Sequence, residues 1–235
     1  MNSIEVKLKA RWVVCVLGFC FLGSFARSLE CTDVMESLAK NKYNFKAWRD
    51  YRAELLKSSQ SEDVEYAKLI EQTQVLATID AEDPRRYSAL GEEKALMESI
   101  GKHLASKYHF KNAQFFGGEI SGTLSGKDLM SSGALLAESK YLVLNLKLVD
   151  ITEGQLRQAL ANPKIQPLLS RIQSLDLVDT ELGNTAAEAL ARTGVVKNLR
   201  HVSFKVGALS GSAKLELDDA TSSRRQTAKD FIKAQ

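Results

Sequence analysis

One segment, residues 172–190, combines two patterns that together limit what this chain can fold into. Its sequence, IQSLDLVDTELGNTAAEAL, predicts a short strand that leads into a sharp turn and has one edge buried. A helix with a narrow apolar face is predicted to follow. The apolar positions that carry this pattern are Ile172, Leu175, Leu177, Leu182 and Leu190. A single unit of this kind cannot bury its apolar face alone, so the segment predicts further copies in the chain.

Three other segments repeat the same internal spacing. They begin at Phe110, Tyr141 and Leu199, which gives steps of 31, 31 and 27 residues when Ile172 is included. With the frame L-x-x-L-x-L-x-x-N-x-L and the segment LGNTAAEALA, residues of about 110–217 resemble the leucine-rich repeat family, and most of all its ribonuclease-inhibitor-like branch. The units that begin at Tyr141 and Ile172 carry most of this resemblance.

The chain departs from the family at the turn after each strand. Where the family prefers Asn or Cys, this chain has Gly118, Val149, Thr180 and Gly207. Of these, only the side chain of Thr180 is able to bond the turn backbone, so the polar ladder of the family is mostly missing. The resemblance implies an α/β fold, a short leucine-rich-repeat-like solenoid of mainly parallel strands with helices on one side.

The first 28 residues are typical of a secretory signal peptide. Lys7, Lys9 and Arg11 precede an apolar run from Trp12 to Ala26, which is short for a membrane span, and small residues follow as cleavage sites. An uncleaved membrane anchor is the alternative. Without residues 1–28 the chain holds 28 basic and 28 acidic residues. This balance gives no electrostatic reason to expect a nucleic acid partner, and cleavage would leave no stable membrane anchor.

Residues 29–107 have helical spacing and predict a small bundle that caps the open apolar end of the repeats at 108–217. Asn44 and Ser61 are candidate N-caps, Asp83-Pro84 predicts a break, and a last helix is expected to follow Gly91. A separate ligand-binding role of this region is the alternative. Its aromatic residues Phe45, Trp48 and Tyr51 fit core packing, or a partner site if they are exposed. Residues 218–235 are expected to form a C-terminal capping helix or tail.

Motifs for catalysis, metals and nucleotides are missing from the sequence. The Gly-rich segment Gly117–Lys127 has only three residues between Gly122 and Gly126-Lys127, and Asp128 stands where a P-loop needs Ser or Thr. The three histidines form no close ligand pair, and no G-x-S-x-G elbow is present. We therefore expect no cofactor, no metal and no catalytic residues.

The outward positions of the repeated strands are the candidate binding residues, since side chains alternate between the two faces of a sheet. Aligning the four units gives three columns of outward residues. These columns are Asn112, Val143, Ser174 and His201; Gln114, Asn145, Asp176 and Ser203; and Phe116, Lys147, Val178 and Lys205. The residues expected to contact a protein or peptide are Phe116, Asn145, Lys147, Asp176, Val178, His201 and Lys205. Leu144, Leu146, Leu175 and Leu177 are expected in the core.

The expected function is that of a non-catalytic protein- or peptide-binding module acting in the periplasm or outside the cell. One alternative is an envelope-associated hydrolase or carbohydrate-acting enzyme with a site between the helical region and the repeats. Another is a structural or assembly factor that dimerises through Cys31, because Cys15 and Cys20 would leave with the signal peptide.

Export is directly testable. The order of basic, apolar and small residues over 7–28 predicts that the exported protein has lost about 26–28 residues. Intact-mass spectrometry of the periplasmic or secreted protein measures this loss. Recovery of the full-length chain from the cytosol would contradict the prediction.

Overall fold

The computed structural model describes residue 31 and residues 33–233 of the 235-residue chain. The expected signal peptide, residues 1–28, lies outside the described residues. Within the described part of the chain, no helix is both long enough and apolar enough to cross a membrane.

The N-terminal region is helical, as the spacing predicts. Residues 33–40 form a first helix, followed by α2 (Phe45–Leu56), α3 (Ser61–Leu76) and α4 (Arg85–Tyr108). The predicted cap at Asn44 is confirmed, since its side chain accepts a hydrogen bond of 3.0 Å from the Ala47 amide. Asp83-Pro84 separates α3 from α4, also as predicted.

Two predicted helix starts are wrong. Gln60, rather than Ser61, is the N-cap of α3, and its side chain makes no capping bond. The last helix starts well before Gly91, which lies inside α4, because Pro84 provides a favourable start at its N-terminus.

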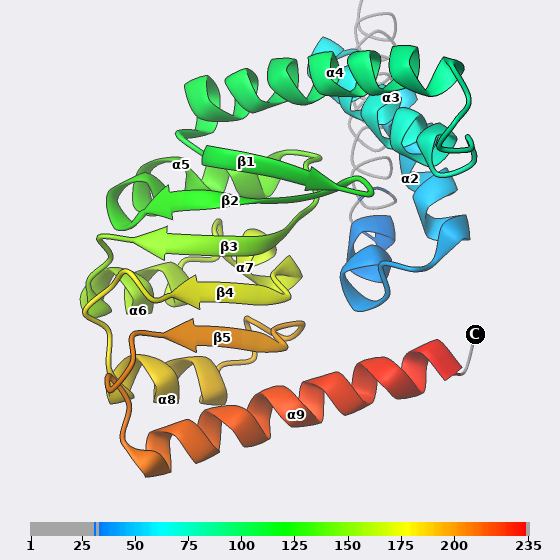
Figure 1. Ribbon diagram of the computed structural model, residues 1–235. Helices are drawn as coiled ribbons and strands as arrows, with labels where there is room; N and C mark the ends of the chain where they lie inside the picture. Colours follow the sequence, from blue (N-terminus) through cyan, green and yellow to red (C-terminus); the bar gives the residue numbers. More distant parts are fainter. Residues whose placement is uncertain (1–30, 32, 234–235) are drawn as a thin grey trace, which may run out of the picture.

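A five-stranded sheet follows, with its strands in sequential order (Figure 1). The strands are β1 (Lys111–Phe116), β2 (Glu119–Ser125), β3 (Val143–Val149), β4 (Ser174–Leu177) and β5 (His201–Phe204). The β1–β2 pair is antiparallel, and β2 through β5 pair in parallel. The predicted α/β class with a mainly parallel sheet is therefore confirmed.

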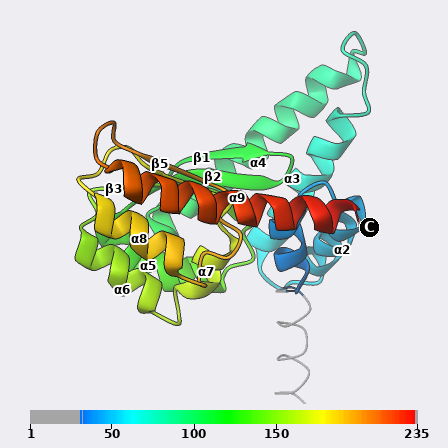
Figure 2. The same ribbon diagram turned by 90° about the horizontal axis from the view of Figure 1, so that it is seen from below.

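The connections between the parallel strands are helical and lie on one face of the sheet. They are α5 (Gly126–Glu138), α6 (Glu153–Ala161), α7 (Gln166–Arg171) and α8 (Asn184–Arg192). Figure 2 shows all four on the same side, while α9 (Gly211–Lys233) runs along the β5 edge and packs on α8. The helix α9 continues through residue 218, where the sequence suggests a separate C-terminal segment.

The buried face of the sheet contains the leucines predicted to be core. Leu144 and Leu177 have no exposed surface, and Leu146 and Leu175 are each 2% exposed. The turn after β4 also behaves as predicted: the Thr180 hydroxyl donates a 2.7 Å hydrogen bond to the Leu177 carbonyl. This bond partly replaces the polar ladder that the chain otherwise lacks.

The predicted columns of outward residues are wrong in their register. Asn145 lies opposite Ser174, and Lys147 opposite Asp176, so β3 is shifted by two residues relative to the alignment of the repeats. Side chains on one face recur every second residue, so the apolar pattern alone does not distinguish registers that differ by two. For the same reason, most residues keep their predicted face. Val143 is an exception, since it was expected to be exposed and has no exposed surface. The pairing of Ser174 with His201 is as predicted.

The first predicted unit also differs. The segment that begins at Phe110 forms β1, which is antiparallel to its neighbour, and the first parallel strand is β2. Gly117 and Gly118, with φ of 60° and 95°, make the tight turn between them. Gly118 therefore lies in a hairpin, whereas Gly207 follows β5, so the two glycines are not equivalent.

A ladder of aromatic side chains joins the helical region to the sheet. The rings of Trp48, Tyr51, Tyr66 and Tyr141 follow one another with centroids 5.2–6.1 Å apart. The Tyr51 hydroxyl donates to the Lys140 carbonyl and the Tyr66 hydroxyl to the Gly118 carbonyl. Helices and sheet therefore share one continuous core, which runs from Cys31 to Leu217.

Two neighbouring residues test the orientation of β4. Leu177 is fully buried, whereas Val178 is 41% exposed. Leu177→Ala should lower the free energy of unfolding by about 2–5 kcal/mol, because it leaves a cavity. Val178→Ala should cost no more than about 0.5 kcal/mol. Urea unfolding followed by circular dichroism measures both, and the reverse order would contradict the strand orientation.

Candidate binding face and interhelical pocket

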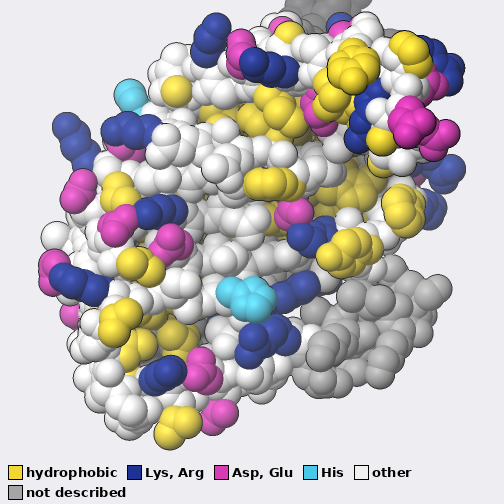
Figure 3. All heavy atoms as spheres, in the orientation of Figure 1, with side chains coloured by type: hydrophobic (Ala, Val, Ile, Leu, Met, Phe, Trp, Pro, Cys, Tyr) yellow, Lys and Arg dark blue, Asp and Glu magenta, His cyan; other side chains and the backbone are white. Residues whose placement is uncertain are grey.

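The face of the sheet opposite helices α5–α8 is open and lined by short polar side chains. Two rows cross the strands: Gln114, Ser121, Asn145, Ser174 and His201; and Thr123, Lys147, Asp176 and Ser203. The members of these rows on β1 to β4 line a shallow trough of about 470 Å³, and His201 and Ser203 extend the rows onto β5. Figure 3 shows the centre of this face as neutral polar groups, with charged and apolar side chains around it.

Ion pairs balance the charges on this face. Lys147 Nζ lies 2.5 Å from Asp179 Oδ2 and 3.9 Å from Asp176 Oδ2. The hydrogen bond to Asp179 raises the pKa of Lys147 above its ordinary value, so its ammonium stays charged at neutral pH. Lys205 pairs with Glu181 at 2.7 Å. The face therefore offers hydrogen-bonding groups and fixed, paired charges rather than a strong electrostatic potential of one sign.

The seven residues predicted to bind a partner lie on or beside this face. Asn145, Lys147 and Asp176 line the trough, and His201 extends their row onto β5. Phe116, at the end of β1, is 58% exposed, and Val178, just after β4, is 41% exposed. Lys205 follows β5 and is also exposed.

Sequence reasoning missed the contribution of β2. Ser121 and Thr123 line the trough, but residues 119–125 were not expected to form a strand. The signal was present in the segment EISGTLS, in which Ile120 and Leu124 are buried and the residues between them are not.

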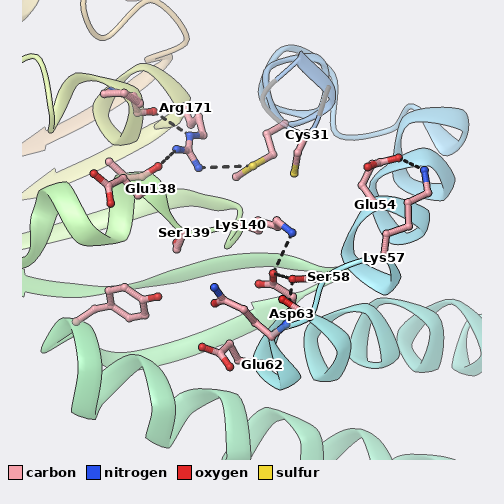
Figure 4. Close-up of a pocket in the computed structure, with 16 residues that line it drawn as sticks. Cys31, Glu54, Lys57, Ser58, Glu62, Asp63, Glu138, Ser139, Lys140 and Arg171 are labelled. Atoms are coloured by element: carbon pink, nitrogen blue, oxygen red, sulfur yellow. Dashed lines mark hydrogen bonds and ion pairs between the residues drawn. The ribbon is translucent and has the colours of Figure 1, made fainter. Parts of the chain in front are cut away.

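A second hollow, of about 680 Å³, lies between the helical region and the layer of α5 and α7 (Figure 4). Lys140 Nζ pairs with Asp63 Oδ2 at 3.1 Å, and the Ser58 hydroxyl donates to the same oxygen. Lys57 pairs with Glu54 at the rim. We call this hollow the interhelical pocket.

Arg171 lines the interhelical pocket and is only 6% exposed. Its guanidinium donates to the carbonyls of Pro167, at 2.9 Å, and Ala137, and it lies 3.7 Å from the Met35 sulfur. Burial lowers the pKa of this group below its ordinary value. Because Ala137 lies in the last turn of α5, this cation satisfies carbonyls that a helix end leaves without partners.

Cys31 also lines the interhelical pocket and is 5% exposed. Burial raises the pKa of its thiol to about 11. The predicted disulfide between two chains through Cys31 stays a prediction, and it requires the thiol to become exposed first.

The interhelical pocket contains carboxylates, among them Glu62, Asp63 and Glu138, but its described residues lack two common catalytic groups. No histidine is among the described residues that line it, and the Cys31 thiol is poorly ionised at neutral pH. Nor does any group of three or more His, Cys, Asp or Glu side chains in the described ranges have the arrangement of a metal site. The chain matches no protein-family model, and no curated protein or solved structure is significantly similar to it.

The burial of Cys31 predicts slow alkylation. At pH 8 its thiolate fraction should be about a hundredfold below that of an exposed cysteine, because its pKa is about 11. Mass spectrometry of the peptide that contains Cys31, after timed iodoacetamide treatment in buffer and in urea, measures this protection. Equal labelling rates in the two conditions would contradict the burial of this thiol.

Proposed function

We propose that this protein is a non-catalytic protein- or peptide-binding module that acts outside the cytoplasm through the open face of its sheet. The observation that carries the proposal is that none of the described helices lies over one face of the mainly parallel sheet. Parallel sheets normally have both faces covered, so an uncovered face lined with polar side chains is an available contact surface.

The chemistry of the trough supports a peptide or protein partner. The amide groups of Gln114 and Asn145 and the hydroxyls of Ser121, Thr123 and Ser174 both donate and accept hydrogen bonds, as backbone groups of a partner do. Phe116 and Val178 add exposed apolar surface beside it. Interfaces combine such apolar contacts with polar ones.

We also propose that residues 108–217 form a short leucine-rich-repeat-like solenoid. The sequential strand order and the helices on one side of the sheet support this assignment. Action outside the cytoplasm rests on the sequence of residues 1–28.

A second candidate function is a hydrolase or carbohydrate-acting enzyme with its site in the interhelical pocket. The observation in its favour is that a hollow of about 680 Å³ lies between the helical region and the sheet layer, with Ser58, Asp63 and Lys140 in contact. Asp63→Asn should abolish any hydrolytic activity of the purified protein on ester or glycoside substrates and leave partner binding unchanged.

Charge reversal on the open face tests the binding proposal. Lys147→Glu combined with Lys205→Glu replaces attraction to Asp179 and Glu181 with repulsion at the surface. The free energy of unfolding should fall by no more than about 1–2 kcal/mol, since exposed ion pairs contribute little. Binding of a partner captured from envelope extract should weaken at least about tenfold through lost complementarity.

The matched control is Lys127→Glu combined with Lys164→Glu, two exposed lysines of which the first lies in α5 and the second between α6 and α7. This control has the same change in net charge and should bind the partner as wild type does. Surface plasmon resonance with the captured partner measures both variants. If the open-face variant binds as tightly as its control, the open face is not the binding surface.

A further inference from the structure

The turn between the first helix and α2 has an unusual surface composition. Residues 37–49, SLAKNKYNFKAWR, contain four basic residues and no acidic residue. Tyr43 is 71% exposed and Phe45 is 84% exposed. The adjacent aromatic residue Trp48 is buried, so these two rings are the ones the turn presents to solvent.

Three of the cations are exposed with the rings. Within the described residues, Lys40 and Lys46 form no ion pair, and Arg49 has only Asp50 at 4.0 Å. Phe45 and Arg49 are one helical turn apart on the outward side of α2, opposite the buried Trp48 and Tyr51. We call Lys40, Tyr43, Phe45, Lys46 and Arg49 the basic–aromatic patch.

The structure holds the base of this turn firmly. Lys42 pairs with Glu119 at 2.8 Å, and the Trp48 indole donates a 2.7 Å hydrogen bond to the Lys42 carbonyl. Arg200 donates to the carbonyls of Ala39 and Lys40, which brings another guanidinium to the same place. The patch is therefore presented on a fixed backbone. Figure 3 shows apolar, basic and acidic side chains over the helical region, beside the open face of the sheet.

The shape of the patch decides between possible partners. Its residues line neither the trough nor the interhelical pocket, and its two rings project into solvent. An acidic peptide could pair with the cations but would leave the two projecting rings in water, whereas a lipid surface accepts such rings at the level of its headgroups. Amphipathic aromatic rings flanked by Lys and Arg have this role at membrane interfaces.

We propose that the basic–aromatic patch docks the protein reversibly on an anionic lipid surface. Lys40, Lys46 and Arg49 attract the headgroups, and Tyr43 and Phe45 enter the interface. This contact is peripheral and uses other residues than the proposed partner site on the sheet.

Vesicle flotation tests the proposal with two lipid compositions: phosphatidylcholine alone, and phosphatidylcholine with phosphatidylglycerol. The apolar run of residues 12–26 and the basic residues before it, if they are retained, also bind vesicles. The measured quantity is therefore the ratio of anionic to neutral binding, compared between wild type and variants. For wild type this ratio should exceed about ten at low salt and fall toward one at high salt, because salt screens exposed charges.

The variants separate charge from aromatic contacts. Lys40→Glu with Lys46→Glu should lower anionic binding at least about tenfold, since each basic residue near the surface contributes to it. Tyr43→Ser with Phe45→Ser should weaken binding to anionic vesicles. The binding that remains should fall more steeply with salt than that of wild type, because it depends on the charges alone. The controls, Lys127→Glu with Lys164→Glu, and Tyr87→Ser, whose ring is 75% exposed, should bind as wild type does.

Each contrary result overturns the proposal. Equal binding of wild type to the two vesicles would show that the contact is not electrostatic. Wild-type affinity of the Lys40 and Lys46 variant for anionic vesicles would show that the patch is not the lipid-binding site. Binding of wild type to immobilised poly-L-glutamate but to neither vesicle assigns the patch to an acidic polypeptide instead. Thermal unfolding by circular dichroism confirms that each variant is folded.

Discussion

The single layer of helices on the sheet is the constraint on which the rest of the structure depends. On β2, β3 and β4, Ile120, Leu146 and Leu175 lie on the face that packs against α5–α8 and are buried there. Each connection between parallel strands returns on the same side, and none of the described helices covers the opposite face. Polar residues on that face follow from this arrangement, and so does its availability for binding.

The helical region and the sheet form one body because of the aromatic ladder. The Tyr51 hydroxyl donates a hydrogen bond to the Lys140 carbonyl, just after α5. The Tyr66 hydroxyl donates to the Gly118 carbonyl, in the β1–β2 turn. Buried carbonyls need such partners. The Lys42–Glu119 ion pair and the bond from Arg200 to the Lys40 carbonyl fix the turn that carries Tyr43 and Phe45 relative to the sheet. Two surfaces of different chemistry, one neutral and polar and one basic and aromatic, are thereby held side by side.

The sequence predicts the periodic parts of this structure and not the parts set by tertiary contacts. The leucines of β3 and β4 and the cap at Asn44 follow from local patterns. The register between β3 and β4 does not, since a two-residue shift preserves the apolar pattern. The start of α4 was missed because Gly91, a helix-weakening residue, is tolerated inside a long helix. The interhelical pocket brings together Ser58, Lys140 and Arg171, which no local spacing connects.

The central claim is that a partner covers the open face, and lysine footprinting tests it most directly. Acetylation by a water-soluble reagent, measured by mass spectrometry, compares free protein with the purified complex. Lys147 and Lys205 should lose reactivity in the complex, while Lys127 in α5 and Lys164 between α6 and α7 keep theirs. Unchanged reactivity at Lys147 and Lys205, with protection at Lys127 or Lys164, would contradict the account.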